Sequence, residues 1–299
     1  NIIDILAIIA TVMGIATSIG LGIMQIGGGL NHLFDVPNNN FTKILITILM
    51  VAIFLGSSLT GLNHGVKWLS NLNILLGAIL LIFILIFGDL KFILESYTLA
   101  ISDYLQHFIE YSLRVNPYSG DDSWIQQWTV FYWAWVISWS PFIGGFVARV
   151  SRGRTIREFV VGVLIIPPLI SFTWIAGFGG TAIKLALNHN DKLVHIVDKD
   201  YTVALFELLS HFPLSEVTSS LAIVLIFIFI VTSADSTTHI VAGMATGGSI
   251  NPTLKHKVLW GLLIGAISVA MTIAGGLKSL QTASVITGLP FSIILLLMI

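Results

Sequence analysis

The chain has 299 residues, of which 56% are hydrophobic and only 10% are charged, and its mean hydropathy is +0.94. A formal net charge of −1 gives no indication of a nucleic-acid partner. The absence of cysteine excludes disulfides, thiol nucleophiles and cysteine-bound metals. Several apolar runs reach about 20 residues, the length that crosses a bilayer core. We therefore predict an all-α, polytopic membrane protein.

Eight membrane-spanning helices are predicted, and we place them in a single transmembrane domain that covers residues 1–299. In chain order, their approximate ranges are 3–26, 43–62, 69–88, 123–148, 159–178, 218–245, 258–275 and 282–299. The sequence begins with Asn1, and both of its ends lie in apolar runs. We therefore expect the chain to be an internal part of a longer protein.

Small residues mark the first span. Gly14, Ser18 and Gly22 recur at every fourth position, and such a face lets neighbouring helices approach closely. Three consecutive glycines follow at positions 27–29. Because glycine adopts a left-handed backbone at little cost, we expect these glycines to end the helix.

The charge distribution predicts a topology. Four arginines lie between positions 149 and 157, directly after the fourth span, which is typical of a short cytoplasmic loop. Segment 179–217 is polar and rich in acids, so we expect it on the outside. Residues 89–113 mix charged and apolar side chains and predict an amphipathic helix. That helix either lies on the membrane surface or connects two spans.

The fourth span contains an unusual series of aromatic residues. Steps of four, three, four and three residues place five rings on one face of a helix, namely Trp128, Tyr132, Trp135, Trp139 and Phe142. Such a ladder suits a cation without hydrogen-bond donors, because each aromatic face attracts a quaternary ammonium group by roughly 0.5–2 kcal/mol. The alternative is an interfacial aromatic belt. A belt lies at one depth, whereas this ladder extends over about 21 Å.

Prolines within two spans predict local distortion. Pro141 removes a backbone donor and clashes with the turn near Ile137, which predicts a break beside the ladder. Pro167 and Pro168 predict a kink in the fifth span.

The sixth span carries hydroxyl side chains beside Asp235. Hydroxyl and carbonyl oxygens suit a hard cation such as Na⁺, which makes Thr232 and Ser233 candidate ligands. The alternative is that these hydroxyls bond back to carbonyls of their own helix. The pair Thr17-Ser18 in the first span matches Thr232-Ser233, and paired glycines follow both, as in the inverted repeats of transporters.

At these motifs the chain resembles the betaine/carnitine/choline transporter (BCCT) family. The resemblance rests on W-T-V-F-Y-W-A-W-V-I-S-W-S-P-F at 128–142, A-R-V-S-R-G-R-T-I-R-E at 148–158, V-T-S-A-D-S at 231–236, A-T-S-I-G-L-G at 16–22 and L-Q-T-A-S at 280–284 before L-P-F at 289–291. It implies a twelve-helix secondary transporter with a leucine-transporter-like inverted-repeat core. This chain would then hold the fifth to twelfth helices.

The resemblance also implies a substrate site. Trp135 and Trp139 match positions that line the central site, and Trp128 and Tyr132 match positions along its outer approach. Family members commonly have two adjacent tryptophans where this chain has Trp135-Val136, so the cage is expected to differ in shape.

The resemblance further implies sodium sites. Phe229, Thr232 and Ser233 match the main sodium site, to which they would contribute backbone and hydroxyl oxygens. Phe142 matches the place of a second sodium site in sodium-coupled members.

The predicted function is therefore Na⁺-coupled symport of a quaternary ammonium compatible solute across the cell membrane. Glycine betaine ranks first, followed by choline or carnitine. We expect no cofactor beyond the coupling ion, no catalytic residue and no nucleic-acid partner; membrane lipid and copies of the chain in a homotrimer are the expected partners. Two alternatives are a sodium-independent exchanger and a non-transporting osmotic sensor. A membrane-embedded metal or haem enzyme is disfavoured, because only His239 among eight histidines lies clearly within a span.

Overall fold

The computed structural model describes residues 2–59, 63–115, 123–189 and 191–298, and all regular structure within these ranges is helical. Seven helical segments there are long and apolar enough to cross a membrane. This confirms the predicted all-α, polytopic membrane fold. The segments are Ile2–Phe34, Asn40–Ser57, Lys67–Phe87, Ile125–Ala148, Ile156–Asn188, Ser215–Ala245 and Leu254–Leu297.

The chain divides into two compact units, which are described separately. Unit 1 comprises Asn1–Asn73, Asn116–Val150 and Val224–Ile299, and unit 2 comprises Ile74–Val115 and Ser151–Ile223. Two helices, α3 (Asn63–Phe87) and α12 (Ser215–Ala245), contribute residues to both units. All of the predicted site residues belong to unit 1.

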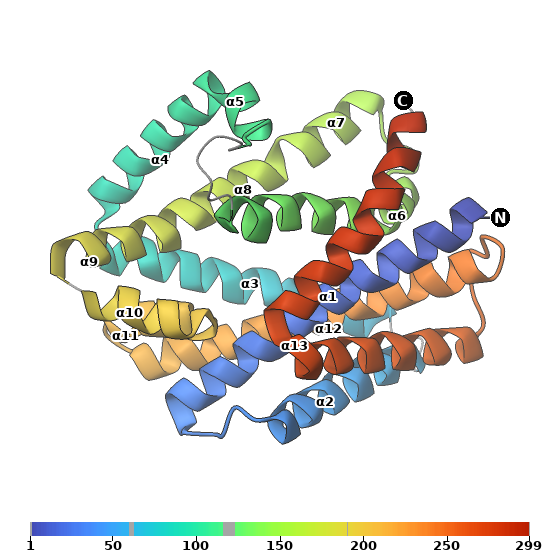
Figure 1. The fold of residues 1–299 in the computed structure, drawn as a ribbon, viewed down its shortest axis with the longest axis horizontal. Coiled ribbons are helices and arrows are strands. Elements are labelled where there is room, and N and C mark those ends of the chain that lie inside the picture. The colour runs from blue at the N-terminus through green and yellow to red at the C-terminus, as the bar shows by residue number, and fades with distance from the viewer. Residues whose placement is uncertain (1, 60–62, 116–122, 190, 299) are drawn as a thin grey trace. The chain divides into compact units, whose positions relative to one another are not determined.

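Unit 1 is built around α1 (Ile2–Phe34), which packs chiefly against α13 (Leu254–Leu297) and α6 (Phe131–Val150). Helix α13 also contacts α6 and α2 (Asn40–Leu59), and Figure 1 shows α1 in blue and α13 in red. Buried side chains surround α1, and Ile15, Ile19 and Ile23 are at most 2% exposed. A helix that is apolar on all sides is stable in such a central position.

The first helix does not end at its three glycines, contrary to the sequence-based expectation. It continues through them to Phe34 and is followed by Asp35 in a left-handed conformation, with φ of 54°. All three glycines are buried, and a Cβ at Gly27 would lie 2.9 Å from the side-chain oxygen of Asn38. At Gly27, the small residue therefore makes room for the following loop instead of ending the helix.

Helix α13 covers both the seventh and the eighth predicted spans. Its backbone departs from helical geometry at Gly276, where φ is 55° and ψ is −133°. L-residues rarely adopt this conformation, so glycine is needed at the break. The two predicted spans therefore appear as two arms of one element.

Helix α6 contains Pro141 but is not broken there, as the sequence had suggested. Proline cannot donate to the carbonyl of Ile137, four residues earlier. The hydroxyl of Ser140 donates to that carbonyl instead, at 2.6 Å. This replacement bond satisfies the freed carbonyl and lets α6 continue to Val150.

Unit 2 consists mainly of short helices. The predicted kink in the fifth span lies at Ile165, where α7 (Ile156–Leu164) gives way to α8 (Ile166–Trp174) with a proline in its first turn. The π-helix η2 (Ile175–Gly180) follows. The predicted polar segment after it is largely helical, with α9 (Thr181–His189), α10 (Asp191–Lys199), η3 (Tyr201–Val203) and α11 (Ala204–Ser210).

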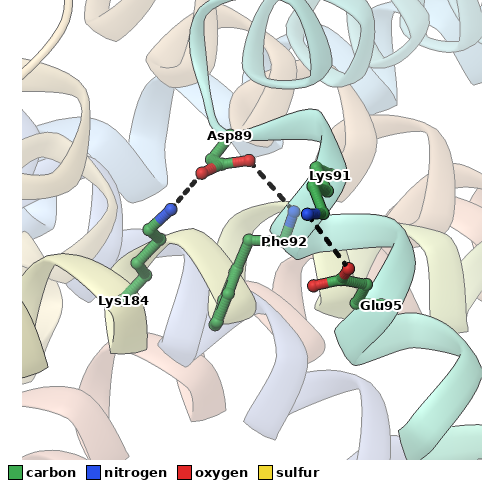
Figure 2. A network of polar contacts seen from close by, with 5 residues as sticks. All are labelled: Asp89, Lys91, Phe92, Glu95 and Lys184. Carbon is green, nitrogen blue, oxygen red and sulfur yellow. Dashed lines mark hydrogen bonds and ion pairs between the residues drawn. The ribbon is translucent and has the colours of Figure 1, made fainter.

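The predicted amphipathic helix is present as α4 (Leu90–Gln106) and α5 (Phe108–Ser112), separated at His107. Figure 2 shows how α4 begins. The Asp89 carboxylate accepts the backbone N–H of Phe92 at 3.0 Å and forms an ion pair with Lys184 of α9. The Lys184 ammonium also lies 5.0 Å from the centroid of the Phe92 ring. Asp89 therefore caps α4 and ties it to α9.

Candidate functional site

The aromatic ladder lies on two consecutive helical elements of unit 1. Trp128 belongs to the π-helix η1 (Ile125–Val130), and the other four predicted rings belong to α6. Ring centroids are 6.4 Å apart for Trp128 and Tyr132, and 5.7 Å apart for Tyr132 and Trp135. Trp139 contacts Phe142 edge-on at 5.4 Å. The structure therefore brings the predicted rings together in two contacting groups.

The surroundings of these rings differ along the ladder. Tyr132 is 50% exposed, whereas Phe142 is only 5% exposed. Val136, at the position where the family commonly has a second tryptophan, is 62% exposed. Trp135 and Trp139, between the two extremes, are partly buried.

A further ring, which the sequence analysis did not single out, supports Trp135. Phe131 is 1% exposed and stacks on the indole with centroids 5.6 Å apart and ring planes 5° apart. Phe131 precedes Trp135 by one helical turn, a spacing that could have identified it. Its stacking covers one face of the Trp135 indole.

Both central tryptophans are hydrogen-bonded to α1. The indole Nε1 of Trp139 donates to the backbone carbonyl of Gly14 at 3.1 Å. The indole Nε1 of Trp135 donates to the same carbonyl at 3.2 Å and to the Ser18 hydroxyl at 3.1 Å. One turn of α1 therefore holds the N–H edges of both indoles.

Helices α1 and α6 approach closely at this point. A Cβ atom at Gly14 would lie 2.9 Å from Cδ1 of Trp139 and 3.2 Å from Cβ of Ser138. Eight residues further along the same small-residue face, a Cβ at Gly22 would lie 2.6 Å from Ile230 of α12. The prediction that this face allows close helix packing is confirmed.

A buried hydroxyl network joins α1, α6 and α13 beside the tryptophans. The hydroxyls of Thr17 and Ser284 lie 2.9 Å apart, and Ser138 donates to the carbonyls of Ala134 at 2.9 Å and Ser284 at 3.3 Å. Thr17, Ser138 and Ser284 are completely buried. Such satisfied polar contacts fix the mutual position of the three helices at the level of the site.

The candidate sodium ligands lie on the regular helix α12. The Thr232 hydroxyl donates to the carbonyls of Ile228 and Phe229, both at 3.0 Å. The hydroxyl thus takes the back-bonded position that was the alternative to ion binding. Phe229 is 53% exposed and Ser233 is partly buried. A hydroxyl and a carbonyl oxygen are thereby held side by side.

Phe142 does not join this group within the described part of the chain. There, no hydrogen bond or ring contact links it to Phe229, Thr232 or Ser233, and its ring contacts are with Trp139 and Phe146. The predicted ring-bearing residues, Phe142 included, thus lie on η1 and α6, and the candidate ligands of the main sodium site lie on α12.

A family model described as betaine/carnitine/choline family transporter matches residues 1–299. Among curated relatives, an ectoine/hydroxyectoine transporter of Virgibacillus pantothenticus is 52% identical over 296 residues, which are 99% of this chain and 59% of that protein. A glycine betaine transporter of Bacillus subtilis is 43% identical over 298 residues, 99% of this chain and 58% of its own length. A glycine betaine/proline/choline transporter of Vibrio parahaemolyticus is 41% identical, with coverage of 99% and 53%.

The chain therefore spans less than two thirds of the length of these relatives. The family description is that of transporters and not of enzymes, which confirms the expectation that the chain is not an enzyme. Together with the seven apolar helices, it also confirms a multi-pass protein of the cell membrane. On this evidence, the chain belongs to the betaine/carnitine/choline transporter family.

Proposed function

We propose that this chain is part of a secondary active transporter that carries a compatible solute with an alkylated or delocalised cationic group across the cell membrane. The observation that supports this proposal most directly is that Trp135 and Trp139 both turn their N–H edges to α1. Because the N–H edges are engaged, a ligand would contact the indoles through a ring face. Indole faces attract alkylated or delocalised cations, by roughly 0.5–2 kcal/mol per ring. The names of the relatives support a substrate of this class.

Glycine betaine is the first candidate substrate, because its trimethylammonium group has no hydrogen-bond donor and suits an aromatic site; choline and carnitine share this group. Ectoine is the second candidate, favoured by the 52% identical ectoine/hydroxyectoine transporter. Its positive charge is delocalised over a planar amidinium, which can stack on an indole face.

Coupling to sodium is a further part of the proposal. The Thr232 hydroxyl and the Phe229 carbonyl lie 3.0 Å apart, and both are hard oxygen donors of the kind that alkali and alkaline-earth cations prefer. Sodium would drive uptake only if its affinity differs between the outward-facing and inward-facing states. A sodium-independent exchanger and a non-transporting osmotic sensor are the two alternatives that the following experiment separates.

The test uses the full-length protein in proteoliposomes. Uptake of radiolabelled glycine betaine and of ectoine is measured with and without an inward sodium gradient. We expect uptake that requires sodium, and in Trp139→Ala we expect the KM to rise about tenfold, since one ring contributes roughly 0.5–2 kcal/mol. Leu289→Ala serves as a control, because Leu289 is 67% exposed and lies outside the aromatic ladder.

The outcomes discriminate between the alternatives. Uptake that is indifferent to sodium but responds to internal substrate indicates an exchanger. Binding of substrate without any flux indicates a sensor. Failure to bind or transport glycine betaine, ectoine, choline and carnitine would contradict the proposed substrate class.

We also propose that the full-length protein forms a homotrimer, with the segment of α4 and α5 at the interface. Apolar side chains of this segment are strongly exposed, among them Leu99 at 71%, Leu105 at 69% and Ile109 at 72%. Exposed apolar surface on this scale suits contact with lipid or with another protein chain. Cross-linking in native membranes that captured only monomers would contradict the trimer.

A further inference from the structure

The two central tryptophans depend on the same small region of α1. We infer that Gly14 and Ser18 are positioning residues of the substrate site, which hold the indole rings of Trp135 and Trp139 in the orientation that presents their faces to the substrate. This inference rests on the proposed function, because it assigns the residues that orient the tryptophans of the proposed substrate site. The hydrogen-bonding geometry on which it stands is independent of which substrate is carried.

The Gly14 carbonyl attracts more donors than it can satisfy. It lies 3.1 Å from the indole Nε1 of Trp139, 3.2 Å from that of Trp135 and 3.2 Å from the Ser18 hydroxyl. A carbonyl oxygen has two lone pairs, and one of them serves the N–H of its own helix. The donors therefore share a limited accepting capacity.

Ser18 offers the Trp135 N–H a second acceptor. Its hydroxyl oxygen accepts the Trp135 N–H at 3.1 Å, while its own proton is directed to the Gly14 carbonyl. Ser18 is 7% exposed, so solvent has little access to take its place. Trp139 therefore donates to the Gly14 carbonyl, whereas Trp135 donates to both Gly14 and Ser18.

Gly14 acts through the absence of a side chain as well as through its carbonyl. A Cβ there would lie 2.9 Å from Cδ1 of Trp139, the carbon bonded to Nε1, and 3.3 Å from the backbone carbon of Ser138. The backbone of α6 cannot move away easily, because Ser138 is held by the buried hydroxyl network. An added methyl group would thus displace the Trp139 ring and break its hydrogen bond.

Each tryptophan has a second contact that completes its positioning. Phe131 stacks on Trp135, and Phe142 meets Trp139 edge-on. A ring that is supported on one side and hydrogen-bonded at its N–H edge has little freedom to rotate. The chain therefore prepares the ring faces before substrate arrives, which reduces the ordering cost of binding.

The first test compares two neighbouring hydroxyl deletions on α1 in the full-length protein. Ser18→Ala removes one of the two acceptors of Trp135, whereas Thr17→Val removes a buried hydroxyl that faces Ser284 of α13. For Ser18→Ala we expect the KM for substrate to rise about three- to tenfold with Vmax unchanged, the range of one ordinary hydrogen bond. For Thr17→Val we expect a lower unfolding temperature and an unchanged KM.

Two further variants separate ring position from ring chemistry. Trp135→Phe keeps an aromatic face but has no N–H, so adding Ser18→Ala to it should raise the KM no further. Gly14→Ala should raise the KM by displacing Trp139. If Gly14→Ala fails to fold, Ser18→Ala and Trp135→Phe still test whether a hydrogen bond from α1 positions an indole ring of the site. Equal KM increases in Ser18→Ala and Thr17→Val would overturn the inference, because they would indicate general loosening of α1.

A substrate-free measurement keeps this inference distinct from the proposed function. Fluorotryptophan is placed at position 135 alone, and its ¹⁹F resonance is recorded in detergent. We expect Ser18→Ala to shift this resonance and Thr17→Val to leave it in place. An unshifted resonance in Ser18→Ala would refute the positioning role even if uptake is normal. Absence of uptake in the wild type would refute the proposed function while leaving the resonance test intact.

Discussion

At the scale of single residues, the Thr232 hydroxyl can either donate to a backbone carbonyl or coordinate a cation through its oxygen. In the structure it donates to the carbonyls of Ile228 and Phe229. A cation bound at these oxygens would require the hydroxyl to present a lone pair instead of its proton. If sodium binds here, Thr232→Val should raise the sodium concentration for half-maximal uptake by at least about tenfold. The reason is that the contact between the hydroxyl oxygen and the ion is expected to contribute about 1.5–3 kcal/mol, as a hydrogen bond to a charged group does.

A matched control lies directly after the last residue of α12. Thr246 donates to Ala242 at 2.8 Å and to Gly243 at 3.1 Å, the same i−4 and i−3 pattern that Thr232 shows. Thr246→Val removes an equivalent hydroxyl near the end of α12 and should leave the sodium dependence unchanged. Intact, sodium-independent uptake by both the wild type and Thr232→Val would favour the exchanger.

The sequence predicted the identity of the ring-bearing residues better than their partners. A spacing rule sufficed to find Trp135 and Trp139, because helical periodicity is local. Gly14 was recognised only as a small residue for packing, and Ser18 as such a residue and as part of the Thr17-Ser18 pair. Their role as acceptors depends on a contact that spans more than 100 positions, 121 between Gly14 and Trp135. Such a contact follows from the tertiary register of α1 and α6, which no local pattern specifies.

At the scale of helices, the break in α13 depends on Gly276. Its backbone, with φ of 55° and ψ of −133°, is strained for any residue with a Cβ. Gly276→Ala should therefore destabilise the protein by about 1–3 kcal/mol, seen as a lower unfolding temperature of the full-length protein in detergent.

The control for this variant is Gly162→Ala. Gly162 lies within α7, and a Cβ there would have no neighbour within 4 Å. Because alanine favours a helix over glycine, this change should leave the unfolding temperature unchanged or raise it slightly. Equal effects of both substitutions would show that the break in α13 does not require glycine.

The start of α4 provides a pH-dependent contact outside the spans. The ion pair with Lys184, followed by the hydrogen bond from the Phe92 N–H, lowers the pKa of the Asp89 carboxyl below its ordinary value of 3.8. A lowered folded-state pKa means that the contact contributes fully above the ordinary value and is lost as the pH falls through the lowered one. Asp89→Asn should mimic this loss at neutral pH.

Hydrogen exchange of the first turn of α4 measures this effect. At about pH 7, the wild type should be more protected than Asp89→Asn, and the difference should shrink as the pH falls below the ordinary carboxyl pKa of 3.8. Glu95→Gln is the control, because Glu95 and Lys91 form a highly exposed pair at 3.8 Å that should contribute little. A difference between the wild type and Asp89→Asn that persisted at low pH would contradict the role of the carboxylate.

Helix existence was predictable, but helix ends were less so. The apolar runs located the spans, because length and hydropathy decide what can cross a bilayer. The glycines at 27–29 and Pro141 were expected to interrupt helices, yet both lie within helices. The rule that glycine and proline interrupt helices ignores the tertiary and local contacts. Gly27 allows close packing against Asn38, and the Ser140 hydroxyl replaces the donor that proline lacks.

At the scale of the molecule, unit 1 gathers the whole candidate site around one buried helix. Helix α1 supplies the hydrogen-bond acceptors for the tryptophans. Its Thr17 is hydrogen-bonded to Ser284 of α13, and its Gly22 packs closely against Ile230 of α12. Composition predicted an all-α membrane protein, and the sequence motifs pointed to the family. The central role of α1 emerged only from the packing, because its sequence has no charged or aromatic side chain in the buried middle of the helix.

The bond between Ser140 and the Ile137 carbonyl also bears on how the protein is made. Donor and acceptor are three residues apart on one helix, so the bond can form as soon as that helix does. A proline-containing segment can thus leave the insertion machinery without an unsatisfied carbonyl, before any partner helix has docked. The indole N–H groups need α1, which precedes α6 in the chain and is synthesised first. The order of synthesis therefore makes the α1 acceptors of Trp135 and Trp139 available by the time that α6 enters the lipid.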